Sequence, residues 1–129
     1  MWFENAIGKE KIKFMFDNEL YIQDIEIYSF SLERFSDLKF RFFLKNIPKK
    51  HPDKWSKEGF NAISMEITFG DVIQLDITGS RVGFSCSPEI ISLKDCSEIK
   101  IEHESLSLYC KSKFLTIDAI TPYIDERWD

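Results

Sequence analysis

The chain has 129 residues, 43% of them hydrophobic and 30% charged, and it carries a formal net charge of −5 at pH 7. This length and composition predict a single globular domain spanning residues 1–129 and exclude a disordered chain. The acidic balance argues against nucleic acid as a direct partner and favours a basic one, because a negative surface attracts positive ones.

The aromatic content of 15%, which includes 12 phenylalanines, is typical of half-buried pleated sheets and favours a mainly β fold. The three cysteines, Cys86, Cys96 and Cys110, are an odd number without close spacing, so we expect reduced, structural thiols and no disulfide framework. The first residues show no basic segment followed by an apolar run, and no apolar run approaches the ~20 residues of a membrane span. We therefore expect a cytoplasmic protein without membrane contact.

The N-terminal third predicts one ambiguous element and two strands. Residues 2–16 alternate as a strand would, whereas Asn5 is suited to cap one short helix, so both interpretations stand. Residues 24–32 predict a strand with a bulge near Tyr28, where the apolar alternation changes phase. The next strand has a period-two apolar face made of Leu38, Phe40, Phe42 and Leu44.

Residues 48–60 form a long, Lys-rich connection. Connections of about 12 residues are uncommon unless they are functional or packed on themselves. Trp55 predicts an anchor that folds this connection onto the sheet. We expect its lysines to form a solvent-exposed face, and the alternative is an anion-binding role.

Two strongly alternating segments follow, residues 63–69 and 73–77, and residues 70–71 between them resemble a hairpin turn. A strict two-residue turn would mix apolar and polar faces. One extra residue at the turn corrects this and places Ile67 opposite Leu75. The sequence therefore predicts two paired antiparallel strands here.

This register also places Glu66 opposite Asp76. Two like charges directly opposite each other destabilise a sheet unless a cation relieves them. In one interpretation, Lys39 or Arg41 compensates the repulsion between the two carboxylates. In the other, a basic protein partner supplies the cation. Adjacent carboxylates also occur in acid and base catalysis, but an open, solvated sheet face is a poor place for it.

The last third predicts a short meander. Residues 79–95 are rich in turn residues and predict a loop with brief extended pieces. Beyond them, the apolar phases agree if Ile101 opposes Leu108 and Leu108 opposes Leu115. Reversals of the chain are expected near residues 104–105 and 111–112. Short loops without intervening amphipathic helices favour antiparallel pairing, so the predicted fold is a curved sheet or a sandwich, with room for one short N-terminal helix.

The sequence carries no catalytic or metal-binding signature. It has two histidines, His51 in the Lys-rich connection and His103 at an expected strand end, which is too few for a His-based metal cluster. It also lacks a Gly-x-Ser-x-Gly elbow and a Gly-rich phosphate loop. We therefore predict no catalytic residue, no metal and no cofactor, and we do not expect an enzyme.

The C-terminal segment is acidic and aromatic. It is either a solvated chain end or a surface for a basic partner, with Tyr123 and Trp128 suited to anchor an interface. Its acidic residues Asp118, Asp125, Glu126 and Asp129 outnumber Arg127. Our candidate partner-binding residues are Glu66, Asp76, Asp118, Asp125 and Glu126.

The centre of the chain carries a resemblance to a known family. Its residues are Pro52-x-Lys54-Trp55, then Asn61 before the alternating segment 63–69, then Asp71-Val72 leading to Gly79, with Trp2 and the bulged strand 24–32 in the same layout. In these residues the chain resembles the Immunity protein 50 family of bacterial polymorphic toxin systems.

The resemblance implies a mostly β protein that binds and neutralises a cognate toxin without catalysis. The shared positions Pro52, Lys54, Trp55 and Asn61 have an architectural character, so they are not carried over as toxin contacts. Two other functions remain open, a β-domain adaptor for a cellular protein and a small-ligand binder that uses the aromatic core as a cavity. The oligomeric state is open as well.

Overall fold

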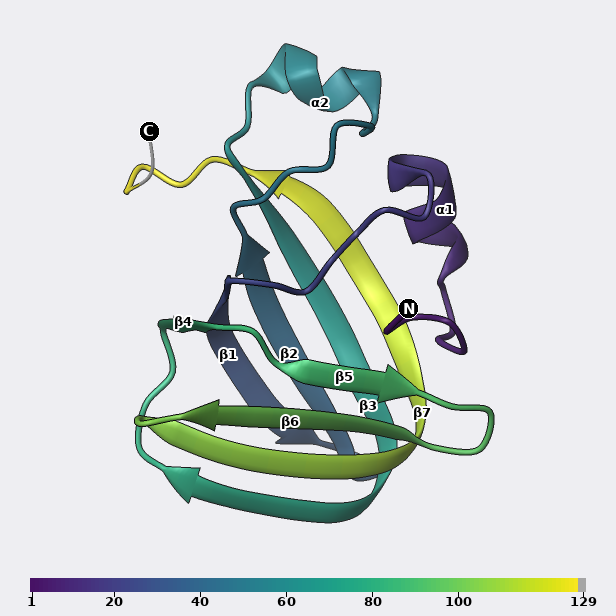
Figure 1. Cartoon of the computed structure of the whole chain (residues 1–129), viewed down its shortest axis with the longest axis vertical. Helices are drawn as coiled ribbons and strands as arrows, with labels where there is room; N and C mark the ends of the chain where they lie inside the picture. Colours follow the sequence, from purple (N-terminus) through teal and green to yellow (C-terminus); the bar gives the residue numbers. More distant parts are fainter. Residues whose placement is uncertain (128–129) are drawn as a thin grey trace.

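The computed structural model describes residues 1–127 and confirms a mainly β fold built on one curled antiparallel sheet (Figure 1). Within these residues, seven strands follow the order β4-β1-β2-β3-β7-β6-β5. The elements are α1 (Glu10–Phe16), β1 (Ile25–Glu33), β2 (Asp37–Leu44), α2 (Asp53–Glu58), β3 (Ala62–Gly79), β4 (Phe84–Cys86), β5 (Glu89–Ser92), β6 (Ser97–His103) and β7 (Leu106–Tyr123).

The strands β3 and β7 have 18 residues each and pair from Ala62 opposite Tyr123 to Gly79 opposite Leu106. The first half of β3 also pairs with β2, whereas the second half pairs with β7 alone. The sheet therefore folds over into two layers that share these strands, and in Figure 1 β5, β6 and the start of β7 cross in front of β1 and β2. The first layer comprises β1, β2, residues 62–70 and residues 114–123; the second comprises residues 72–79, residues 106–112, β6 and β5.

The bend between the layers lies at Gly70 and Asp71. Gly70 lies against the ring of Phe114, and a Cβ added to this glycine would be 2.2 Å from a ring carbon. Asp71 is held from both sides: its N–H donates to Asp37 Oδ1 at 3.0 Å, and its carboxylate lies 2.9 Å from Lys113 Nζ. Close aromatic packing on a glycine and these polar contacts fix the change of strand direction.

The predicted hairpin of residues 63–69 with 73–77 is wrong, because both segments belong to the continuous strand β3. Residues 70–71 have turn chemistry, but here they bend the strand without reversing it. The reason is non-local: β7 offers a partner along the whole length of β3, and a hairpin would forfeit that pairing.

The predicted meander is right at its first turn and wrong at its second. Ile101 pairs with Leu108, as expected for a reversal at residues 104–105. The chain does not reverse at residues 111–112, so Leu108 pairs with Ile77 of β3 on its other side.

Of the two alternatives for the N-terminal segment, strand or short helix, the structure shows the short helix α1. Ile12 and Phe16 of α1 are buried against the sheet. Asn5 does not cap this helix, because its side-chain amide donates to the backbone oxygen of Ser92 at 2.9 Å. The bulge expected near Tyr28 is confirmed as a register shift in the pairing of β1 with β2.

The expected loop of residues 79–95 contains the brief extended pieces β4 and β5. The three cysteines are free thiols, as predicted. Burial raises the pKa of the Cys86 thiol to about 11 and that of Cys110 to about 12, so both stay protonated near neutral pH.

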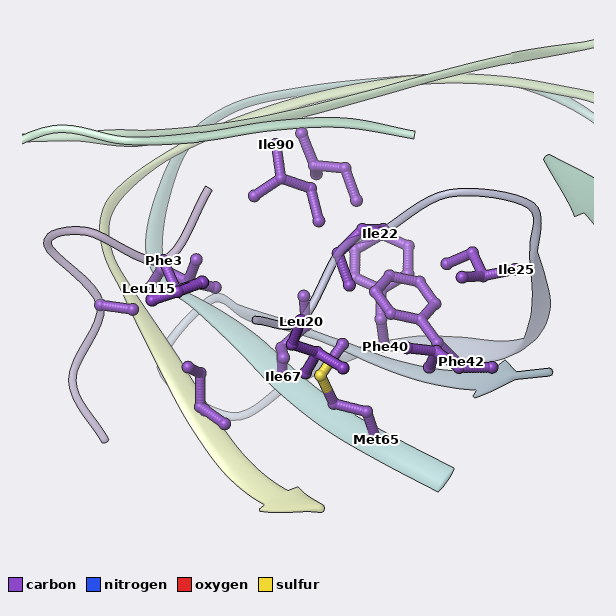
Figure 2. Packing of buried hydrophobic residues seen from close by; sticks show 14 of the residues in the cluster. Phe3, Leu20, Ile22, Ile25, Phe40, Phe42, Met65, Ile67, Ile90 and Leu115 are labelled. Carbon is purple, nitrogen blue, oxygen red and sulfur yellow. The ribbon is translucent and has the colours of Figure 1, made fainter. Parts of the chain in front are cut away.

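The core lies between the two layers and is closed at one end by the N-terminal segment and the helices (Figures 1 and 2). The predicted apolar face of β2 is confirmed as fully buried. The ring of Phe40 lies 5.5 Å from that of Phe42 and 5.8 Å from that of Phe69, measured between centroids. Figure 2 shows Leu20, Ile22 and Ile90 close to the rings of Phe40 and Phe42, and Leu115 beside Phe3.

Trp55 is the anchor that the sequence predicts for residues 48–60. This connection contains α2, and Trp55 from α2 is only 3% exposed. Its ring makes edge contacts with Phe16 of α1, at 5.7 Å, and with Phe60, at 5.6 Å. The tryptophan therefore joins both helices to the core.

We expect Trp55→Ala to lower the free energy of unfolding by about 3–5 kcal/mol, because it leaves a large cavity between α1 and α2. Urea unfolding followed by circular dichroism measures this loss. The matched control is Phe14→Ala, since Phe14 lies in α1 but is 78% exposed; it should change stability by less than about 0.5 kcal/mol. Similar losses in both variants would show that Trp55 is not the anchor.

Candidate functional site

The outer face of the first layer is the surface that β1, β2, β3 and the end of β7 turn away from the core. Alternation along β2 directs Leu38 and Phe40 inward and Lys39, Arg41 and Phe43 outward. The helices pack on the opposite, inner side of this layer, through the buried side chains of α1 and α2. The outer face is therefore a rigid platform whose side chains are polar and aromatic.

Three aromatic side chains, here called the aromatic trio, stack across this face: Tyr28 of β1, Phe43 of β2 and Tyr123 of β7. The ring of Phe43 lies 4.7 Å from each tyrosine ring, measured between centroids. Phe43 is 5% exposed, whereas Tyr28 and Tyr123 are 48% and 39% exposed. The bulge in β1 places Tyr28 here, because it is the extra residue between the paired positions Ile27 and Ser29.

Exposed tyrosines on a buried aromatic base have the composition of an interface anchor. Tyrosine offers a large apolar area with few rotamers to freeze and a hydroxyl for hydrogen bonding. A sheet holds these rings at fixed positions before any partner arrives. The aromatic trio is therefore a rigid, partly exposed aromatic surface.

An ion pair lies beside the aromatic trio. Arg41 donates to Glu66 from both Nε, at 3.0 Å, and Nη2, and Lys39 Nζ lies 3.9 Å from the same carboxylate. The hydrogen bond from Arg41 is the main reason that the pKa of Glu66 is lowered and that of Arg41 raised. The structure thus confirms that two cations of β2, Arg41 and Lys39, compensate the negative charge of Glu66.

Glu66 does not oppose Asp76, so the predicted carboxylate pair is wrong. Glu66 pairs with Arg41 and Ala119, whereas Asp76 lies in the second layer opposite Tyr109. There the Asp76 carboxylate accepts a hydrogen bond from Gln74 Nε2 at 2.8 Å. The bend in β3 separates the two residues, because they lie in different layers of the sheet.

Residues 124–127 continue from the end of β7 across the first layer to β1. The side-chain amide of Asn61 donates to the backbone oxygen of Asp125 at 2.8 Å, and its Oδ1 accepts from the N–H of Asp125 at 2.7 Å. The guanidinium of Arg127 then joins Asp125, at 2.6 Å, to Glu26 of β1, at 2.8 Å. This chain of contacts connects β3, the C-terminal segment and β1.

Both carboxylates of this network are shielded from water, with Asp125 4% and Glu26 9% exposed. Hydrogen bonds from Arg127 hold the pKa of Asp125 below its ordinary range, and those to Asp125 and Glu26 raise the pKa of Arg127. Buried carboxylates remain ionised only when a cation and hydrogen bonds compensate them. Arg127 therefore forms ion pairs with two shielded acidic side chains near the aromatic trio.

The candidate residues fall into three groups. Glu66 and Asp118 lie on the outer face, where Thr68 Oγ1 donates to Asp118 Oδ2 at 2.5 Å. Asp125 is buried and positions Arg127, while Glu126 is exposed in the following turn. Asp76 is separate, in the second layer. Trp128 and Asp129, also expected to contribute to this surface, lie outside the described residues.

The sequence missed Phe43, Glu26 and Arg127 as parts of this surface. Phe43 was detectable as an apolar residue on the otherwise charged side of β2, but Glu26 gave no signal. Its role depends on Arg127, which is 101 residues away in the chain.

Three of the positions that carry the family resemblance make structural contacts. The backbone oxygen of Pro52 accepts the Trp55 N–H at 3.0 Å at the start of α2, and Trp55 is buried. Asn61 holds the C-terminal segment. Lys54 is exposed on α2.

Residues 1–127 contain no group of three or more His, Cys, Asp or Glu side chains placed to hold a metal ion. Neither helix in this described range combines the length and apolar composition needed to cross a membrane.

Fold and surface together define a class: a mainly antiparallel β domain with a curled half-barrel sheet and a preorganised outer face. The family model of Immunity protein 50 matches residues 8–123, nearly the whole chain, so this protein belongs to the Immunity protein 50 family. No curated protein and no solved structure was found to match it. The family match extends beyond the stretch from Trp2 to Gly79 that carried the resemblance in the sequence.

We expect Arg127→Gln to destabilise the protein at neutral pH, because Glu26 and Asp125 lose their shared cation. The folded-state pKa of Asp125 lies below its ordinary value of 3.8. Its stabilising effect is therefore complete above that value and is lost as the pH falls through the folded pKa. The difference in urea midpoint between wild type and variant should shrink below about pH 4.

The control for this titration is Arg81→Gln, which removes an exposed arginine outside the network. It should leave the urea midpoint nearly unchanged at every pH. A gap between wild type and Arg127→Gln that stays constant down to pH values below the Asp125 pKa would contradict a charge-based role for Arg127.

Proposed function

We propose that this chain is a cytoplasmic immunity protein that neutralises a cognate toxin of a bacterial polymorphic toxin system by stoichiometric binding. The observation that carries the proposal is membership of the Immunity protein 50 family over residues 8–123. Immunity protein families are generally non-catalytic, and the proposed action needs no catalytic group and no cofactor. The partner is a protein, and neither nucleic acid nor a membrane is required.

The outer face of the first layer is the proposed docking surface. The aromatic trio supplies the central anchors, and the pairs Arg41–Glu66 and Arg127–Glu26 surround it with charges that are already compensated. Such a rim excludes water without adding a large desolvation cost, which is the arrangement of many interface hot spots. Binding here would cover the active site of the toxin or block a conformational change that the toxin requires.

The net charge of −5 favours a basic toxin, such as a nuclease, because long-range attraction accelerates the encounter. Asp118 and Glu126 contribute to this attraction as exposed carboxylates near the outer face. Asp76, now placed in the second layer, is not part of the proposed surface.

The decisive experiment is co-expression of this chain with the toxin domain encoded immediately upstream of its gene. We expect the cells to survive and the two proteins to purify as one complex. Cell death together with separate elution of a correctly folded chain would reject the proposed function and favour the adaptor or ligand-binding alternatives.

Given such a complex, we expect Tyr28→Ala and Tyr123→Ala each to weaken toxin binding by about 2 kcal/mol, or roughly 30-fold in Kd. Each removes an exposed ring that Phe43 supports from below. Tyr21→Ala is the matched control, because Tyr21 is 59% exposed and lines hollows with residues 46–48 and 88–91, not with the trio. Calorimetry of the purified complex measures all three. An equal loss for Tyr21 would place the interface elsewhere.

The electrostatic part of the proposal predicts a change in association rate. Asp118→Asn combined with Glu126→Gln should lower kon about threefold at low salt, with little effect on koff, because exposed rim charges act mainly on encounter. Asp76→Asn with Glu104→Gln removes the same charge from the second layer and should have a smaller effect. If kon does not change with ionic strength, charge does not guide binding.

A further inference from the structure

The second half of β3 is an open strand edge. Its pairing with β2 ends at Phe69 opposite Leu38, and from Val72 to Gly79 the strand pairs only with β7. Its other side has no partner strand among residues 1–127. In Figure 1 this segment forms the lower margin of the sheet. An unpaired edge presents backbone donors and acceptors that can accept another strand.

The register with β7 shows which backbone groups face the open side. Gly79 pairs with Leu106, and the next residue, Ser80, donates its N–H to the oxygen of Ser105 at 3.1 Å. In an antiparallel pair, residues that bond to the partner alternate with residues that bond to the opposite side. The N–H and C=O groups of residues 75, 77 and 79 therefore point into the open.

A second contact supports this assignment from the other end of the edge. The N–H of Val72 points to the open side, where it donates to the oxygen of Ser36 at 2.8 Å. The register shift between Val72 and Gln74 adds one residue to the strand. An extra residue reverses the alternation. The outward residue before the bulge is therefore the even-numbered Val72, and the outward residues after it are the odd-numbered 75, 77 and 79.

The side chains of this edge are apolar and largely unprotected. Ile73, the extra residue of the bulge, is 56% exposed, and Ile77, on the same side of the strand as Leu75, is 42% exposed. Ile77 also lines a hollow of about 340 Å³ together with Val82 and Leu106. Natural edges are commonly protected by lysine or proline. Residues 72–79 contain neither, and Asp76 is their only charged residue.

Another edge of the same sheet shows how this protein covers a strand. On β5, the N–H of Asn5 donates to Ser92 Oγ at 3.0 Å and its side-chain amide donates to the Ser92 oxygen. The N-terminal segment thus blocks that edge. The edge of residues 75–79 of β3 has no such cover from another strand among residues 1–127.

We propose that this edge pairs with the same edge of a second copy of the chain, antiparallel, about a two-fold axis at Ile77. This register makes Leu75 of one copy face Gly79 of the other and sets the two Ile77 residues side by side. It also places Asp76 opposite Thr78, whose hydroxyl can donate to the carboxylate. All three outward residues then exchange backbone hydrogen bonds, about six in total.

The neighbouring registers are unfavourable. An axis at Asp76 would oppose two carboxylates, which destabilises a sheet. An axis at Leu75 would drive the incoming strand into the β1–β2 turn, because Ser36 already occupies the edge position beside Val72. Of these three registers, the one centred on Ile77 is therefore the most favourable. This self-complementarity favours a symmetric dimer over an unrelated strand.

The interface is small, so the dimer should be weak and reversible, with a Kd on the order of 10 μM. Sedimentation equilibrium of the full chain without toxin measures it. Ile77→Lys should weaken the dimer at least about tenfold, since it sets two like charges together at the axis. Thr78→Lys adds the same charge one residue away, opposite Asp76, and should retain or tighten the dimer.

Circular dichroism must show that both variants are folded. A wild-type chain that stays monomeric up to its solubility limit would overturn the proposal. So would a dimer that Ile77→Lys leaves intact. If the wild-type chain is monomeric and Ile77→Lys abolishes toxin binding, the edge binds the toxin and not a second copy.

Discussion

The continuous pairing of β3 with β7 is the interaction on which the rest of this structure depends. These two strands are the only elements of the described chain that run through both layers, so they fix the position of one layer relative to the other. The core forms where the layers face each other. Its rings and aliphatic side chains stabilise the fold, but the paired strands determine where those side chains meet.

The bend in this pair also determines what each surface displays. Before Gly70, β3 has neighbours on both sides and contributes Glu66 to a platform supported by β2 and β7. After Asp71 it has a neighbour on one side only. One strand therefore takes part in a closed, rigid face and in an open edge, and the two surfaces suit different kinds of partner: side-chain anchors on the face, backbone groups on the edge.

Sequence patterns predicted the features that depend on neighbouring residues. The β2 face, the bulge at Tyr28 and the burial of Trp55 all follow from local alternation or from a single large side chain. Residues 70–71 and 111–112 misled the prediction because their turn chemistry is genuine but a long-range partner overrides it. The candidate surface divides in the same way: Glu66 and Tyr123 were visible in the sequence, whereas the bridge from Arg127 to Glu26 exists only after the ends of the chain have met.

The same long-range pairing has a consequence for how the protein is made. Residue 62 pairs with residue 123, so the first layer cannot be completed until residue 123 has left the ribosome. Folds dominated by such distant contacts form slowly. Until β7 arrives, the Ile- and Val-rich second half of β3 has no strand on either side, which makes the nascent chain prone to aggregation. The rate of synthesis and the help of chaperones would then set how quickly active protein accumulates.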